Sequence, residues 1–295
     1  MMCKAMKTIT KTVFSVLCLF GVVALAELPA PFPCERVGDI DQVQFNEPSG
    51  LCYHARRGTL FAVGDEGDVG EMATDGTMVQ QKRVRSADFE GITYDPSSGL
   101  LYVAVEGEES ILEMDPDSLK VLREFDIPRS FQGATLMKAG GQGIEAITFV
   151  PDPKHPQGGT FFVANQSMKM NDPEDISGIF ELEVPLKNPG KVKILRYFEP
   201  GIPDLSGLYY DFADDRLYAI SDATDQIMAY SRSGERLGLW TLPGNDQEGL
   251  AADAQGFLYI AQDSGGIIKF KWRRESTPSS GLTQDGPMDA GNPAR

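Results

Sequence analysis

The sequence predicts an all-β protein whose folded part is a five-bladed β-propeller. Three observations support this prediction. One pair of strand-like segments recurs five times along the chain. The end of the second segment repeats after 41 residues in two places, from Asp65 to Glu106 and from Asp222 to Asp263. Such a period suits one blade of four strands. Two further short segments follow most of the pairs, which completes the strand content of a blade.

Each first segment opens on an acidic or small residue followed by Gly or Ala, and each second segment is apolar and ends in an acid or amide. The second segments end at Asp65, Glu106, Gln166, Asp222 and Asp263. Third strands are expected over Gly70–Ala73, Ile111–Met114, Gly178–Leu182, Gln226–Tyr230 and Gly266–Phe270. Fourth strands are expected over Gln80–Val84, Val121–Phe125, Val192–Tyr197 and Leu237–Leu242.

The fifth copy has no fourth strand of its own, but Arg36–Val43, upstream of the first copy, has the right character. We therefore expect this N-terminal strand to complete the last blade, which closes the ring and removes exposed sheet edges. A β-sandwich does not predict a five-fold recurrence. The third copy carries two long insertions, 151–159 and 168–178, so a six-bladed ring remains an alternative.

The first 26 residues have the pattern of a secretory signal peptide. Lys4, Lys7 and Lys11 make the start positive, Thr12–Leu25 is almost wholly apolar, and Ala24-Leu25-Ala26 is an A-x-A cleavage site. We expect an exported, periplasmic protein, with association with the cell membrane as an alternative.

After cleavage, residues 27–274 are expected to form a single propeller domain, and residues 275–295, rich in Pro, Gly, Ser and Asp, a disordered tail. The remaining 24 basic and 43 acidic residues give a net charge near −19. A surface this acidic repels nucleic acid and anionic lipid and attracts cations. We expect a monomer.

Two cysteines remain after cleavage, Cys34 and Cys52. Their spacing fits no zinc motif. An exported protein meets an oxidising compartment, so a disulfide between them is one interpretation. Two free buried thiols are the other.

Two rings of polar side chains are expected at one end of the propeller. First strands line the centre of a propeller, and consecutive strands are antiparallel. The start of each first strand and the end of each second strand therefore lie at the same end. The first ring is Ser49, Glu90, Glu145, Ser206 and Glu248, and the second is Asp65, Glu106, Gln166, Asp222 and Asp263.

Seven of these ten side chains are carboxylates, and crowded carboxylates raise one another's pKa values. A bound cation could relieve the crowding, and oxygen-only ligands favour Ca²⁺ or Mg²⁺. We therefore predict a divalent-cation site, with calcium as the ion, formed by Asp65, Glu90, Glu106, Glu145, Asp222, Glu248 and Asp263. Alternatively, one carboxylate stays protonated for acid–base chemistry, or the acids only bind backbone groups of neighbouring blades.

The repeat signatures resemble those of the SdiA-regulated (YjiK-like) family. They are Glu47-Pro48-Ser49-Gly50-Leu51, Asp88-Phe89-Glu90-Gly91-Ile92, Asp204-Leu205-Ser206-Gly207-Leu208 and Glu248-Gly249-Leu250-Ala251. The resemblance covers Arg36 to Lys271 and implies a bacterial exported or envelope-associated five-bladed propeller linked to calcium responses. It implies no catalytic residues. The third copy departs from the pattern at Ala146, where the others have Gly.

The leading functional hypothesis is a cation-binding envelope sensor or scaffold without strong enzymatic activity. The alternative is a hydrolase that uses the same carboxylates. A glycosidase would use carboxylates from the set Glu90, Glu145 and Glu248. A phytase-like phosphoesterase would need basic groups that the two rings lack. The exposed-looking Met168-Lys169-Met170 segment could bind a protein partner in the envelope, although a solvated loop is the favoured interpretation.

Overall fold

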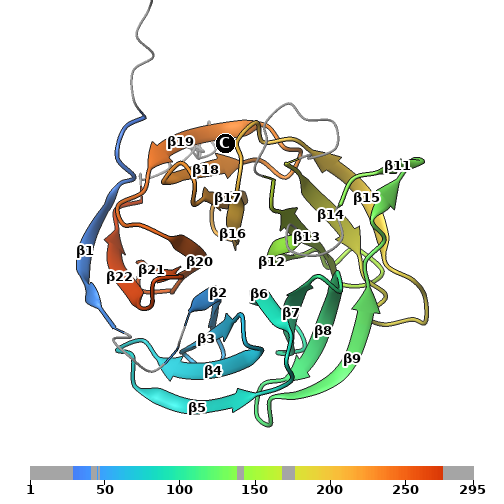
Figure 1. The fold of residues 1–295 in the computed structure, drawn as a ribbon, viewed down its shortest axis with the longest axis horizontal. Helices are drawn as coiled ribbons and strands as arrows, with labels where there is room; N and C mark the ends of the chain where they lie inside the picture. Colours follow the sequence, from blue (N-terminus) through green and yellow to red (C-terminus); the bar gives the residue numbers. More distant parts are fainter. Residues whose placement is uncertain (1–28, 41–44, 46, 138–142, 168–176, 275–295) are drawn as a thin grey trace, which may run out of the picture.

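Five four-stranded antiparallel sheets are arranged around a central axis in this computed structural model (Figure 1). The structure describes residues 29–40, 45, 47–137, 143–167 and 177–274. In each sheet the strand order follows the chain from the centre outward, except in the last, where the first strand of the chain is outermost. The predicted five-bladed β-propeller is therefore confirmed.

Each blade can be followed from its innermost to its outermost strand. Blade 1 is β2 (Pro48–His54), β3 (Thr59–Gly64), β4 (Asp68–Ala73) and β5 (Met78–Arg83). Blade 2 is β6 (Asp88–Tyr94), β7 (Leu101–Glu106), β8 (Ser110–Asp115) and β9 (Lys120–Asp126). Blade 3 is β12 (Ile144–Pro151), β13 (Gly159–Asn165), β14 (Ile179–Glu183) and β15 (Lys193–Phe198). Blade 4 is β16 (Leu205–Asp211), β17 (Arg216–Ser221), β18 (Gln226–Tyr230) and β19 (Arg236–Thr241). Blade 5 is β20 (Gln247–Ala252), β21 (Phe257–Gln262), β22 (Ile267–Trp272) and β1 (Cys34–Asp39).

The ring closes where the N-terminal strand β1 pairs antiparallel with β22, with Cys34 opposite Trp272. This is the predicted closure. The residues just before β1 strengthen the same seam, because Phe32 is buried there against Trp240 and Trp272. Closure leaves the central strand β20 of the last blade in contact with β2 of the first.

The hydrophobic core lies between neighbouring blades. Phe61 and Val63 of blade 1 pack in one cluster with Phe89 and Val103 of blade 2. Similar clusters fill the other four seams. Apolar side chains on both faces of each sheet are buried in this way, which explains why the second strands are apolar at nearly every position.

Glycine follows the ring residue because neighbouring first strands approach closely there. A Cβ atom on Gly91 would lie 2.7 Å from the backbone nitrogen of Ile147, and one on Gly249 would lie 2.5 Å from that of Leu51. Neither separation leaves room for a methyl group. The acid–glycine pairs of the sequence are thus packing signatures at the glycine, whatever the acid does.

The alternative of a sixth blade is wrong for the described residues. The chain between blades 2 and 3 adds only a two-stranded hairpin, β10 (Ser130–Phe131) with β11 (Ala134–Thr135). The insertion at 151–159 contributes the tight connection between β12 and β13. The predicted signal peptide (1–26), the predicted tail (275–295) and the Met168-Lys169-Met170 segment lie outside the described residues. In the part that is described, no helix could cross a membrane.

Cys34 and Cys52 are both free, so the disulfide interpretation is wrong. Cys52 is buried as the other interpretation expected, whereas Cys34 is half-buried. Cys34 lies on the outermost strand of blade 5, whereas Cys52 lies on the innermost strand of blade 1. Strands at opposite edges of two sheets do not bring their side chains to bonding distance.

Candidate functional site

The seven predicted carboxylates all lie at one end of the propeller. The ladder pairs Asp88 with Glu106 in blade 2 and Leu205 with Ser221 in blade 4, so the starts of the first strands and the ends of the second strands share this end. The acidic funnel, as we call this end, comprises Asp65, Glu90, Glu106, Glu145, Asp222, Glu248 and Asp263.

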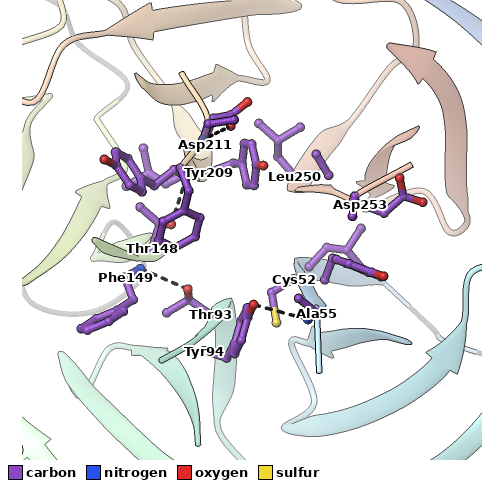
Figure 2. A pocket seen from close by; sticks show the side chains of 18 of the residues that line it. Cys52, Ala55, Thr93, Tyr94, Thr148, Phe149, Tyr209, Asp211, Leu250 and Asp253 are labelled. Atoms are coloured by element: carbon purple, nitrogen blue, oxygen red, sulfur yellow. Dashed lines mark hydrogen bonds between the residues drawn. The ribbon is translucent and has the colours of Figure 1, made fainter. Parts of the chain in front are cut away.

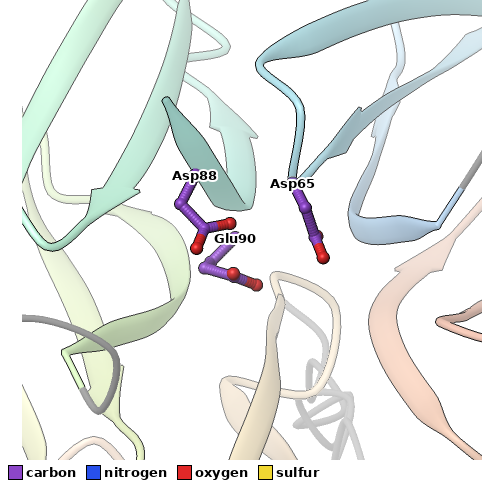
Figure 3. A group of neighbouring side chains, drawn as sticks. All are labelled: Asp65, Asp88 and Glu90. Carbon is purple, nitrogen blue, oxygen red and sulfur yellow. The ribbon is translucent and has the colours of Figure 1, made fainter. Parts of the chain in front are cut away.

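Three carboxylates of blades 1 and 2 form the closest group in the funnel. One oxygen from each of Asp65, Asp88 and Glu90 lies within 4.8 Å of the others (Figure 3). The Ser49 hydroxyl donates a hydrogen bond to Asp65. One buried oxygen of Asp88 accepts no hydrogen bond. The group therefore offers carboxylate oxygens that no donor in the described structure fully satisfies.

Glu90 and Glu145 are buried, with exposed fractions of 9% and 7%. Burial, and then the charge of Glu106, raises the pKa of Glu145 to about 10. Burial, followed by the charge of Glu145, raises the pKa of Glu90 well above its ordinary value. The Glu145 carboxyl is consequently neutral near pH 7 when nothing else is bound.

The pKa of Glu248 responds to acids from several blades. Burial, followed by the charges of Asp222, Asp263, Asp204 and Asp65, raises its pKa to about 9. Those neighbours come from blades 4, 5 and 1. The funnel therefore behaves electrostatically as one site to which every blade contributes, including the third blade with its Ala146.

Glu106 is held by the neighbouring blade. Its Oε1 accepts a hydrogen bond of 2.8 Å from the backbone nitrogen of Gly143. Burial nonetheless raises its pKa, as it does for Asp65, Asp222 and Asp263. Glu106 thus binds the backbone of a neighbouring blade, whereas Glu90, Glu145 and Glu248 have no such bond in the described structure.

No Lys or Arg in the described part of the chain forms an ion pair with the seven funnel acids; the arginines pair instead with acids elsewhere, such as Arg57 with Glu71 and Arg123 with Glu113. The excess negative charge is therefore not neutralised by described basic side chains. It can be relieved by protons or by a cation from solution.

Two further funnel acids were missed by the sequence interpretation, Asp88 and Asp204. Each stands two residues before a ring residue, Glu90 or Ser206, and each contributes to the raised pKa values of the buried glutamates. The signal was available, because the corresponding position in four copies is acidic: Glu47, Asp88, Asp204 and Asp246.

The other ring members have structural contacts. The Ser206 hydroxyl donates to the backbone oxygen of Gln247 in the next blade at 2.7 Å. The Gln166 backbone nitrogen donates to Gly143 at 3.0 Å. Beneath the rings, the first strands leave a cavity of only about 10 Å³, which is room for about one water molecule. We call this constriction the waist; it separates the funnel from the other end of the molecule.

A glycosidase or protease interpretation gains little from the geometry. Phe89, Tyr102, Tyr218 and Tyr259 are buried in the blade seams and present no platform for a sugar. The segment Gln262-Asp263-Ser264-Gly265-Gly266 resembles the nucleophile segment of trypsin-like proteases, but it forms the end of β21 and the turn that leads to β22. His54 ends β2 on the side away from the funnel, with its Nε2 against the Gly99 carbonyl at 3.0 Å, so it is not a base for Ser264.

Comparison with known proteins agrees with the fold. The crystal structure of Myxococcus xanthus glutaminyl cyclase matches with a TM-score of 0.59 and 12% identity, covering 83% of this chain and 97% of that one. The β-propeller domain of Myceliophteria thermophila Cps50 (Swd1) matches with a TM-score of 0.47 and 9% identity, covering 81% of this chain and 99% of that one. At these identities the likeness concerns the fold alone. No curated protein matches the sequence significantly.

The family model described as SdiA-regulated matches residues 37–270. These residues run from β1 to β22 and so include all five blades and the whole acidic funnel. The chain belongs to the SdiA-regulated family.

Proposed function

We propose that the acidic funnel binds a divalent cation, with calcium as the preferred ion. The observation that carries this proposal is the position of buried Glu90 and Glu145 and half-buried Glu248 at one end of the ring without a described basic partner. Carboxylate oxygens are hard ligands that suit Ca²⁺ and Mg²⁺. Calcium accepts six to eight oxygens in adaptable geometry, which fits ligands that come from several blades better than the strict octahedron of magnesium.

Binding of the cation would be an exchange of protons for metal. Near pH 7 the raised pKa values keep Glu145 and Glu248 protonated in the free protein, and a metal ligand must be deprotonated. Calcium binding should therefore release protons, and the affinity should increase with pH. Titration calorimetry in two buffers of different ionisation enthalpy measures this release directly.

Thermal unfolding of a protein starting at residue 27 tests the site. After chelation, millimolar Ca²⁺ should raise the melting temperature more than Mg²⁺ does, because the folded state alone binds the ion. The double variant Glu90→Gln with Glu248→Gln should lose this rise. Glu199→Gln with Glu235→Gln, which neutralises two exposed acids, is the matched control and should keep it. A calcium response that survives in the funnel variant would refute the site.

In the cell, we propose that the protein is exported and that the funnel makes it a calcium-responsive sensor or scaffold of the envelope. The support is the signal-like N-terminal sequence together with the binding site proposed above. Fractionation of cells that express the chain with and without residues 1–26 tests export. Only the full chain should reach the periplasm.

A second candidate is an acid–base enzyme that acts on a cationic substrate. A buried carboxyl with a pKa of about 9 or 10 is neutral near pH 7 and could donate a proton to a leaving group, and an acidic funnel attracts amines. The similar structure from Myxococcus xanthus is a glutaminyl cyclase. Incubation with a peptide that begins with glutamine, followed by mass spectrometry for loss of ammonia, tests that activity. Activity that Glu145→Gln abolishes would favour the enzyme.

A further inference from the structure

A ligand-sized cavity of the described structure lies at the end of the propeller opposite the acidic funnel. It has a volume of about 540 Å³ and is formed by the final residues of the first strands and the turns that follow them (Figure 2). Pockets for small ligands typically have volumes of about 300–1,000 Å³. We call it the aromatic pocket.

The inner wall of the aromatic pocket is apolar and well packed. It includes Leu51, Ile92, Phe149, Leu208 and Leu250, one from each blade, and all are at most 5% exposed. The hydroxyls of Thr93 and Thr148 accept hydrogen bonds of 3.1 Å from backbone nitrogens of the next blade. These bonds tie blades 2, 3 and 4 together around the cavity, so its wall is preformed.

Half-buried tyrosines surround the opening. Tyr53, Tyr94 and Tyr209 lie on three different first strands and line the cavity (Figure 2 labels the last two). The Tyr94 ring stacks on His54 with centroids 4.4 Å apart, and its hydroxyl accepts a bond from Ala55. Tyrosines combine a large apolar face with a polar tip at low entropic cost, which suits a rim that contacts a ligand.

The charges that line the pocket are already paired. Asp211 forms an ion pair with Arg274, in which Oδ2 lies 2.5 Å from Nη1 of the arginine. Asp211 also accepts a hydrogen bond from the backbone nitrogen of Ala213. Asp253 accepts bonds of 2.8–2.9 Å from the backbone of Gln255 and Phe257 and from the Tyr259 hydroxyl. A charged ligand would therefore find no unpaired counter-charge among the lining residues, and burying it would cost free energy.

We propose that the aromatic pocket is a second ligand site, which binds an uncharged and mainly apolar small molecule with a few hydroxyl or carbonyl groups. The apolar body would lie among the five inner side chains, and the polar groups would meet the tyrosines at the rim. The waist, with room for about one water molecule, lies between this pocket and the funnel. The aromatic pocket therefore lies apart from the cation site proposed above.

Binding of the neutral dye Nile red, followed by its fluorescence, tests the proposal on the protein starting at residue 27. The wild type should bind one dye molecule, and the anionic dye 1-anilinonaphthalene-8-sulfonate should bind at least about tenfold more weakly. Ala254→Trp places a bulky ring at an exposed position that lines the pocket, and it should weaken Nile red binding at least about tenfold. Ala55→Trp, a second such position, should act alike.

Two control variants distinguish dye binding in the aromatic pocket from nonspecific binding to the surface and from binding in the funnel. Ala134→Trp adds the same ring to the exposed hairpin strand β11 and should bind the dye like the wild type. The funnel variant Glu90→Gln with Glu248→Gln should also bind normally. Absence of dye binding by the wild type, equal affinity for the anionic dye, or full binding by both pocket variants would overturn the proposal.

Discussion

Gly50 on β2 and Glu90 on β6 are so close that a Cβ atom on Gly50 would lie 2.8 Å from the Glu90 carbonyl oxygen. The substitution Gly50→Ala must therefore push two first strands apart at the level of the funnel. We expect it to lower the free energy of unfolding by about 1–3 kcal/mol, as overpacking of a tight core does. Urea denaturation followed by circular dichroism measures the loss.

The matched control is Gly38→Ala, because a Cβ atom there would meet nothing within 4 Å. Gly38 also lies in a strand, β1, so the backbone effect of adding a methyl group is similar at the two positions. We expect a change of no more than about 0.5 kcal/mol. Equal effects of the two substitutions would show that interblade spacing is not what requires glycine at position 50.

Phe32 fixes the seam at which the ring closes. Its ring lies 5.5 Å from that of Trp272 in blade 5 and 5.6 Å from that of Trp240 in blade 4, and these are the two tryptophans of the chain. Phe32→Ala should cost about 3 kcal/mol and shift tryptophan emission to longer wavelength. Val37→Ala on the neighbouring strand, where Val37 is 57% exposed, should change neither the stability nor the emission.

The blades could be predicted from the sequence because each strand pairs mainly with the strand that follows it in the chain, and the repeat shows both strands together. Segments such as Phe89–Ile92 and Leu101–Glu106 recur in the same order along the chain, and β1 was found because blade 5 lacked one strand. The ring positions of Glu90, Glu145 and Glu248 followed from antiparallel pairing alone. Their burial did not, because it depends on how closely the five first strands approach.

What the sequence left hidden depends on contacts between blades. Asp88 and Asp204 look like turn residues, yet they lie in the funnel because the chain enters each first strand there. The aromatic pocket was also missed. At the fourth position after the ring residue, blades 1 to 4 carry Tyr53, Tyr94, Phe149 and Tyr210, whereas blade 5 carries Ala252; this smaller side chain leaves room at the wall, and only the assembled ring shows it.

The two thiols should be protected in the folded protein and free in the unfolded one. Burial raises the pKa of Cys34 to about 11 and that of Cys52 further, so little reactive thiolate exists at pH 8. Iodoacetamide without any reductant should label the native protein starting at residue 27 slowly, and it should add two groups once this protein is unfolded in urea. Mass spectrometry counts the groups, and a protein that takes up none until it is reduced would contain a disulfide.

The funnel glutamates make the stability of the metal-free protein depend on pH. In the unfolded chain Glu145 and Glu248 ionise near pH 4.5, whereas burial in the folded protein raises their pKa values to about 10 and about 9. Between these limits the folded state holds more protons, so the free energy of unfolding falls as pH rises. After chelation, the melting temperature should therefore be higher near pH 5 than near pH 8 at constant ionic strength.

Single substitutions distinguish the pH dependence caused by the funnel glutamates from that caused by other ionisable groups. Glu248→Gln removes one proton-holding group and should make the fall shallower. Glu183→Gln is the control, because hydrogen bonding to Lys193 lowers the pKa of Glu183 and this group therefore changes ionisation only below the window. Saturating calcium should also flatten the fall, since the ion binds the deprotonated funnel more tightly as pH rises. A chelated protein that is more stable near pH 8, or a Glu248→Gln variant with an unchanged slope, would contradict the assignment of protonated glutamates to the funnel.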